Sequence, residues 1–172
     1  QERPTINAFS LPGGYVYIFK DLYDKLGDDS ELSAVIAHEA AHIVARHGVK
    51  RMQSAYGYNI LMIIASQAQT GNQNIGRAYA AINSLMMSYG REDELFADKL
   101  SVKYTKKAGY NAEGVVKVLQ LLMDLQKKEP ERPYINERSH PYLSIRLSRA
   151  RQEIYGRMDF TDYINIPTET NR

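Results

Sequence analysis

The sequence predicts a mainly helical domain with a small β-sheet, which places it in the α+β class. Three observations support this prediction: most apolar residues recur at helical spacing, only one clear segment alternates as a strand does, and no internal repeat is present. With 172 residues, of which 44% are hydrophobic and 24% charged, the chain is long enough to bury one core. We therefore expect residues 1–172 to form a single domain.

The first two predicted elements are a strand and a helix. After a Pro-Gly-Gly turn, residues 15–19 alternate aromatic side chains with Val and Ile, which is typical of a strand. Asp28 or Ser30 can cap a helix that begins near Glu31. The apolar residues of this helix recur at helical spacing, at Leu32, Val35, Ile36 and Ile43.

The middle of the chain is predicted to be helical and apolar. The pattern runs over residues 52–89 and is broken by the polar stretch at 69–76, which we expect to be a mobile loop. A further helix is expected from about Glu92 to Gly109, because glycine is common just after a helix C-terminus.

The last third of the chain is predicted to contain two more helices. Asn111 can cap the first, and residues 127–142 read as a loop because of their proline and charge content. An amphipathic helix is expected over residues 143–155, and the tail after residue 160 is expected to be frayed. The buried face of the first helix is predicted to comprise Val115, Val118, Leu119, Leu122 and Met123.

The composition argues against several kinds of partner and site. A net charge of +2 gives no strong field for nucleic acid or an anionic membrane, so no nucleic-acid partner is expected. The absence of cysteine excludes disulfides and thiolate metal sites. The longest apolar run, residues 60–65, is far below the ~20 residues needed to cross a bilayer and is predicted to be a buried helix segment.

The segment "VIAHEAAHIVARH" at 35–47 places ionisable side chains on an otherwise apolar helix. His38 and His42 are four residues apart, so they lie one turn apart and differ by only about 40° around the helix. Both imidazoles can therefore reach one ion, and Glu39 on the flank can contact a water at that ion. This pattern is HExxH, in which two histidines bind zinc and the glutamate acts as general base. The sequence thus predicts one zinc ion per chain.

His47 is predicted to lie outside this site. It follows His38 by nine residues, which is about 180° around a continuous helix, so we expect a packing or surface histidine near the helix end. The metzincin pattern HExxHxxGxxH would bring a third histidine back, but it requires glycine and histidine where this chain has Ala45 and Gly48.

A third ligand must come from elsewhere, because zinc in hydrolytic sites usually takes three protein ligands. The candidates are His140 and the acidic residues of "REDELFADKLS". Glu94 and Asp98 are spaced i, i+4, so one could bind zinc while the other orients a ligand histidine. A solvated acidic helix start is the alternative, and it accounts for Glu92 and Asp93 better than for Asp98.

Four segments, in order, resemble the gluzincin zinc metallopeptidases that include HtpX heat-shock proteases, CAAX prenyl endopeptidases and BepA- and LoiP-type periplasmic proteases. They are "NAFSLPGGYVYI" at 7–18, "ELSAVIAHEAAHIVARH" at 31–47, "REDELFADKLS" at 91–101 and "SHPYLSIRLSR" at 139–149. The short apolar run at 60–65 favours the soluble BepA- and LoiP-type branch. Gly90 departs from the serine of many relatives, and only six residues precede the first segment. The resemblance implies a zincin-like catalytic domain over residues 1–172.

The resemblance also implies roles for individual residues. Glu39 matches the catalytic base, and Asp98 matches an aspartate described as a proton donor, although its spacing fits better with orienting a ligand histidine. His140 matches a histidine in a loop near the cleft, which could stabilise the oxyanion or cap zinc in a closed form; a surface histidine is the alternative. The zinc ligands implied by the resemblance are His38, His42 and Glu94.

The function implied by the resemblance is zinc-dependent endopeptidase activity on unfolded or misfolded polypeptides, in protein quality control in the periplasm or cell envelope. Such a substrate would bind as an extended strand along residues 15–19, unless that strand is simply core sheet. Membrane association would depend on parts not present in this chain. The alternative is a latent or low-activity zinc-binding quality-control module with chaperone-like behaviour, whose cleft is covered by residues 69–76 and the His140 loop.

Overall fold

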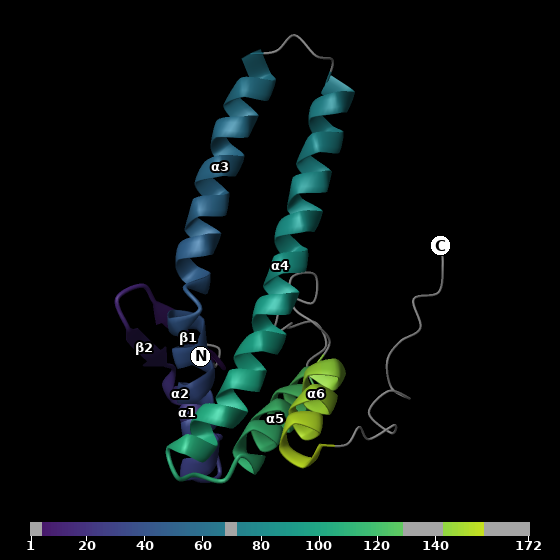
Figure 1. Ribbon diagram of the computed structural model, residues 1–172. Helices are drawn as coiled ribbons and strands as arrows, with labels where there is room; N and C mark the ends of the chain where they lie inside the picture. The colour runs from purple at the N-terminus through teal and green to yellow at the C-terminus, as the bar shows by residue number, and fades with distance from the viewer. Residues whose placement is uncertain (1–4, 68–71, 129–142, 157–172) are drawn as a thin grey trace.

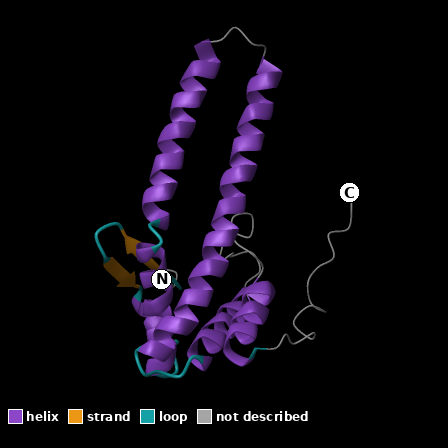
Figure 2. Cartoon of the chain, viewed as in Figure 1, coloured by secondary structure: helices purple, strands orange, loops and turns teal. Residues whose placement is uncertain are grey.

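The computed structural model describes residues 5–67, 72–128 and 143–156, with side-chain detail outside residues 58–89. It confirms the α+β class, because the described residues form helices and one two-stranded antiparallel sheet (Figures 1 and 2). In chain order, the elements are β1 (Ala8–Leu11), β2 (Tyr15–Ile18), α1 (Lys20–Tyr23), α2 (Asp29–Val44), α3 (His47–Gln67), α4 (Asn72–Lys107), α5 (Glu113–Lys128) and α6 (Leu143–Tyr155).

The predicted strand is confirmed as β2, and it pairs with β1 in a hairpin. The register runs from Ala8 opposite Ile18 to Leu11 opposite Tyr15. Between the strands, Gly13 and Gly14 have φ values of 105° and 96°, which glycine adopts without the steric cost that a side chain would add. The strand β1 was not specified individually by the sequence, because four residues carry too little alternation to identify a strand.

The core forms where α2 packs against α4 and α5, while α6 closes the other side of α4 and α5. Both predicted helix caps are present: Asp28 accepts a hydrogen bond from the Glu31 backbone N–H, and Asn111 accepts one from that of Glu113. The start of α5 lies so close to the first turn of α2 that a Cβ on Gly114 would be 2.2 Å from the Ser30 carbonyl oxygen. The apolar core residues in this region include Ala34, Val102, Val115, Leu119 and Leu147.

The helices α3 and α4 run side by side away from the rest of the fold (Figure 1). The predicted loop at 69–76 is wrong for residues 72–76, because α4 begins at Asn72. The helix expected from Glu92 is the C-terminal part of this longer helix, which continues through the polar residues that suggested a break. Residues 68–71 lie outside the described part.

The remaining predictions for the chain's helices have mixed outcomes. Residues 60–65 are helical within α3, but their side chains are not described. The predicted helix at 143–155 is confirmed as α6, whereas residues 129–142 and the tail after 156 lie outside the described residues. Across the part of the chain that the structure describes, no helix combines the length and apolar character needed to cross a membrane.

Candidate metal centre

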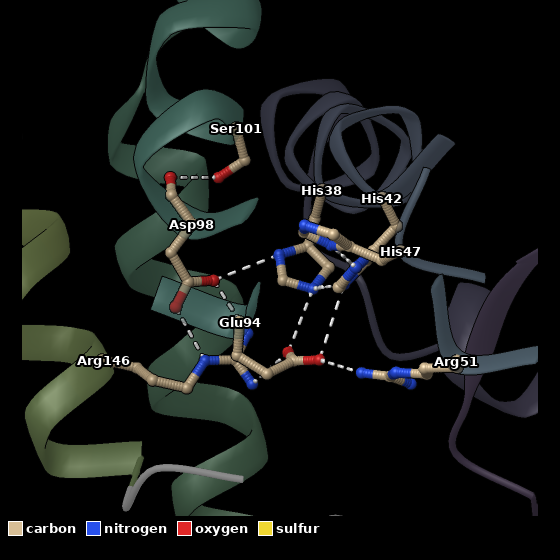
Figure 3. Close-up of polar contacts among 8 residues, drawn as sticks. All are labelled: His38, His42, His47, Arg51, Glu94, Asp98, Ser101 and Arg146. Carbon is tan, nitrogen blue, oxygen red and sulfur yellow. Dashed lines mark hydrogen bonds and ion pairs between the residues drawn. The ribbon is translucent and has the colours of Figure 1, made fainter. Parts of the chain in front are cut away.

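Three side chains from α2 and α4 converge on one point (Figure 3). The Nε2 atoms of His38 and His42 lie 3.1 Å apart. The Glu94 carboxylate faces both imidazoles, with one oxygen 3.3 Å from His38 Nε2 and the other 3.5 Å from His42 Nε2. The helical spacing of the two histidines places them together, and the packing of α4 on α2 brings the carboxylate to them.

The donor set of this cluster fits a zinc ion. Imidazole nitrogens and a carboxylate oxygen are ligands that zinc accepts, at metal–ligand distances near 2.0–2.2 Å. A tetrahedral site with such distances has neighbouring ligand atoms about 3.3 Å apart, and the three separations between the imidazoles and the carboxylate are 3.1, 3.3 and 3.5 Å. Among the described residues, His38, His42 and Glu94 form the group with metal-ligating geometry.

The second nitrogen of His38 is held by a buried ion pair. Its Nδ1 atom lies 3.1 Å from Asp98 Oδ1. Arg146, on α6, donates two 2.7 Å hydrogen bonds to the Asp98 carboxylate, and its third nitrogen lies 3.2 Å from Glu94. Asp98 and Arg146 are only 2% and 5% exposed. Asp98 thus lies behind His38, at the ring nitrogen that faces away from Glu94 and His42.

The charges in this cluster shift the pKa values of the two histidines in opposite directions. Burial lowers the pKa of His38, but the carboxylates of Asp98 and Glu94 more than offset burial and hold it at about 9. Burial and the neighbouring His38 lower the pKa of His42 to about 3. Burial alone would raise the pKa of Asp98, but Arg146 overcomes it and holds this pKa below its usual value.

The prediction that His47 points away from the cluster is wrong. His47 is 3% exposed, and its Nδ1 atom lies 2.8 Å from Nδ1 of His42. Its Nε2 atom lies 3.1 Å from Asp93 Oδ1. The angular argument assumed a continuous helix, but α2 ends at Val44 and Arg46 adopts a left-handed conformation with φ 56°, so α3 starts in a new direction at His47.

Glu39 is buried beside the cluster in a pocket of about 440 Å³. The Ser10 side chain of β1 lines the same pocket. Burial raises the pKa of Glu39, and this effect exceeds the opposing influence of His38 and Ser10. The pocket is lined by residues 6–10, so the strand beside the cluster is β1 and not the predicted residues 15–19.

Two arginines at the cluster were not identified from the sequence. Arg146 lies on the buried face of α6 with Leu143, Leu147 and Ala150, and an arginine at an otherwise apolar helical position was the signal that could have revealed it. The more exposed Arg51 of α3 approaches Glu94 from the other side, at 3.7 Å (Figure 3). His140 lies outside the described residues.

Comparison with known proteins supports the predicted resemblance. The model of Peptidase family M48 matches residues 1–154. The beta-barrel assembly-enhancing proteases of Yersinia pestis and Escherichia coli K12 are 28% and 29% identical to this chain, over 85% of its length and 32% of theirs. The mitochondrial metalloendopeptidase OMA1 of Schizosaccharomyces pombe is 25% identical, over 87% of this chain and 44% of its own length.

The match extends over most of this chain but not over most of its relatives. The chain spans about a third of the length of the beta-barrel assembly-enhancing proteases that it matches. No solved structure matches it significantly. Because the family match covers nearly the whole sequence, including both helices that form the metal-ligating cluster, the chain belongs to peptidase family M48.

Proposed function

We propose that residues 1–172 form the catalytic domain of a zinc-dependent endopeptidase, with His38, His42 and Glu94 as the zinc ligands. The observation that supports this most strongly is the convergence of three donor groups at 3.1–3.5 Å from one another. The family membership of the chain and the metalloendopeptidase names of its relatives agree with it. Zinc bound by these residues would supply Lewis acidity, which polarises a scissile carbonyl and increases the acidity of water.

Glu39 is the proposed general base. It lines the same pocket as His38 and His42, and its raised pKa makes it a stronger base than an ordinary exposed glutamate. In this role Glu39 accepts a proton from the attacking water and passes it to the departing amine. Asp98 is assigned a positioning role, because it faces His38 Nδ1 and Arg146. His140 stays a proposed contributor to the oxyanion site or to closure of the cleft.

The proposed substrate is a polypeptide bound in extended form along β1. Residues 8–10 of this strand line the pocket that also contains Glu39, and backbone pairing with a strand tolerates many sequences. This tolerance suits unfolded or misfolded polypeptides. The relatives named for β-barrel assembly support a role in quality control in the periplasm or cell envelope, although relatives named as mitochondrial show that the family is not confined to one compartment.

Metal analysis combined with a casein-cleavage assay tests this proposal. Glu39→Gln is expected to keep its zinc and lose cleavage, whereas Glu94→Ala is expected to lose zinc as well. Glu92→Ala, which removes an exposed carboxylate of the same helix, is the matched control and should behave as the unmodified chain. Full cleavage by Glu39→Gln, or unchanged zinc content in Glu94→Ala, would contradict these assignments.

The same assay separates the enzyme from a latent quality-control module. For an endopeptidase, cleavage is expected to stop when a chelator removes zinc and to return when zinc is restored. A protein that binds zinc in the expected ratio but never cleaves casein would favour the latent module. A protein whose cleavage survives complete zinc removal would exclude the proposed zinc chemistry.

A further inference from the structure

We infer that His47 and Asp93 are positioning residues that fix the tautomer and the ring orientation of His42. The inference deepens the proposed function and rests on it, because His42 needs orienting only if it binds a metal. Its basis is a continuous chain of contacts, in which His42 Nδ1 lies 2.8 Å from His47 Nδ1 and His47 Nε2 lies 3.1 Å from Asp93 Oδ1.

The direction of the hydrogen bonds in this chain follows from the position of His42. Its Nε2 atom faces His38 and Glu94, so metal binding requires a lone pair on Nε2 and a hydrogen on Nδ1. The Nδ1–H group of His42 then donates to Nδ1 of His47. That acceptor role leaves the hydrogen of His47 on Nε2, from which it donates to the Asp93 carboxylate. Each group in the chain thus has one role that agrees with its neighbours.

The two ligand histidines are therefore anchored in different ways. His38 donates directly to a carboxylate, Asp98, which Arg146 holds in place. His42 reaches its carboxylate, Asp93, through the intervening imidazole of His47. Because Asp93, Glu94 and Asp98 all belong to α4, this helix supplies one proposed ligand and both anchoring carboxylates.

The break between α2 and α3 makes the second anchor possible. A continuous helix would carry the side chain at position 47 to the opposite face, as the angular argument predicted. The left-handed backbone at Arg46 redirects the chain, and His47 becomes the first residue of α3. His47 also packs against Phe96, with ring centroids 6.2 Å apart, so a purely structural packing role is the alternative that an experiment must exclude.

Two substitutions at position 47 distinguish positioning from packing. His47→Asn keeps an acceptor atom at the δ position, whereas His47→Phe keeps an aromatic ring and removes the acceptor. Zinc affinity, measured by competition with a chromophoric chelator, is expected to fall roughly ten- to hundred-fold in His47→Phe and clearly less in His47→Asn. A packing role predicts that His47→Phe keeps more zinc affinity than His47→Asn. Equal zinc affinities in the unmodified chain and both variants would overturn the inference.

Neighbouring acids on α4 provide a second test that does not alter the buried ring. Asp93→Ala is expected to weaken zinc binding several-fold, whereas Glu92→Ala, one residue away and exposed, should leave it unchanged. The visible absorption spectrum of the Co²⁺-substituted protein should change in Asp93→Ala and not in Glu92→Ala, since it reports ligand geometry. Identical affinities and spectra for the two variants would overturn the inference.

The outcomes for the inference and for the proposed function can be separated. If the unmodified chain binds zinc and Glu94→Ala does not, the proposed metal site stands whatever the variants at positions 47 and 93 show. If those variants then bind zinc normally, only the positioning role fails. If the unmodified chain binds no zinc, the proposed function fails and this inference fails with it.

Discussion

Replacing Arg146 with methionine tests whether this buried cation balances the charges of the metal-ligating cluster. Arg146 is 5% exposed and bonds to Asp98 at 2.7 Å through two nitrogens, with Glu94 at 3.2 Å from the third. Near neutral pH, His38 is also a cation when no metal is bound, because its pKa is about 9. Two cations then balance the carboxylates of Asp98 and Glu94, and Arg146→Met leaves one buried negative charge unbalanced.

The expected loss of stability follows from this imbalance. Removing one partner of a buried ion pair costs about 3–5 kcal/mol, and methionine restores part of the lost packing but none of the charge. Arg146→Lys should lose less, because it keeps the charge while losing the two-nitrogen contact to Asp98. Zinc would bring two positive charges to the cluster and displace about one proton from His38, so the positive charge near Glu94 would still rise. The deficit of Arg146→Met should therefore be smaller in zinc-loaded protein than in chelator.

Urea unfolding followed by circular dichroism measures these free energies. Arg149→Met is the matched control, since Arg149 is exposed on the same helix and its replacement should change the free energy of unfolding by no more than about 0.5 kcal/mol. If Arg146→Met in chelator stays within about 1 kcal/mol of the unmodified chain, charge balance is not what Arg146 provides, and the reasoning is refuted.

Three further predictions concern packing, acid stability and zinc binding. Gly114→Ala should destabilise the fold by about 1–3 kcal/mol or more, because its Cβ would meet the Ser30 carbonyl oxygen at 2.2 Å; an unchanged melting temperature would contradict this contact. The hydrogen bond from Lys117, and to a smaller extent the one from the Glu31 backbone N–H, lowers the pKa of Asp28 below its ordinary value of 3.8. The charge of Asp28 therefore stabilises the fold above pH 3.8, and this stabilisation disappears as the pH falls through the lowered pKa. The melting temperatures of the unmodified chain and Asp28→Asn should therefore differ near neutral pH and converge in acid, and a constant difference would contradict the ion pair. Zinc binding near pH 7 should release about one proton from His38, whose pKa is about 9, so zinc affinity should rise with pH up to that value; calorimetry in buffers of different ionisation enthalpy measures the release, and a heat independent of the buffer would refute it.

Local features of the chain were predictable from the sequence. The caps at Asp28 and Asn111, the strand that became β2 and the pairing of His38 with His42 depend on residues within a few positions of one another. The length of α4 was not predictable in this way, because its polar N-terminal residues resemble those of a loop and the helix pairs with α3.

The anchoring of the cluster also exceeded what the sequence could specify. Angular spacing placed His47 away from the site, because nothing in the sequence marked a left-handed residue at Arg46. Arg146 lies in a segment that also contains Arg149 and Arg151. Its apolar neighbours on one helical face could have marked it as buried, but only the packing of α6 places it against Asp98.

The sequence by itself determined that the two imidazoles of HExxH lie together on one side of a helix with the glutamate beside them. Residues one helical turn apart face the same side whatever surrounds them. From residue spacing alone, the third donor was left open between Glu94, Asp98 and His140, and only the family resemblance pointed to Glu94. Tertiary structure decided the geometry, because the packing of α4 on α2 brings Glu94 to both Nε2 atoms and turns Asp98 toward Nδ1 of His38. The same packing, together with the helix break before His47, decided which residues contact the Nδ1 atoms of His38 and His42. Contacts between distant parts of a chain arise only when the core is formed.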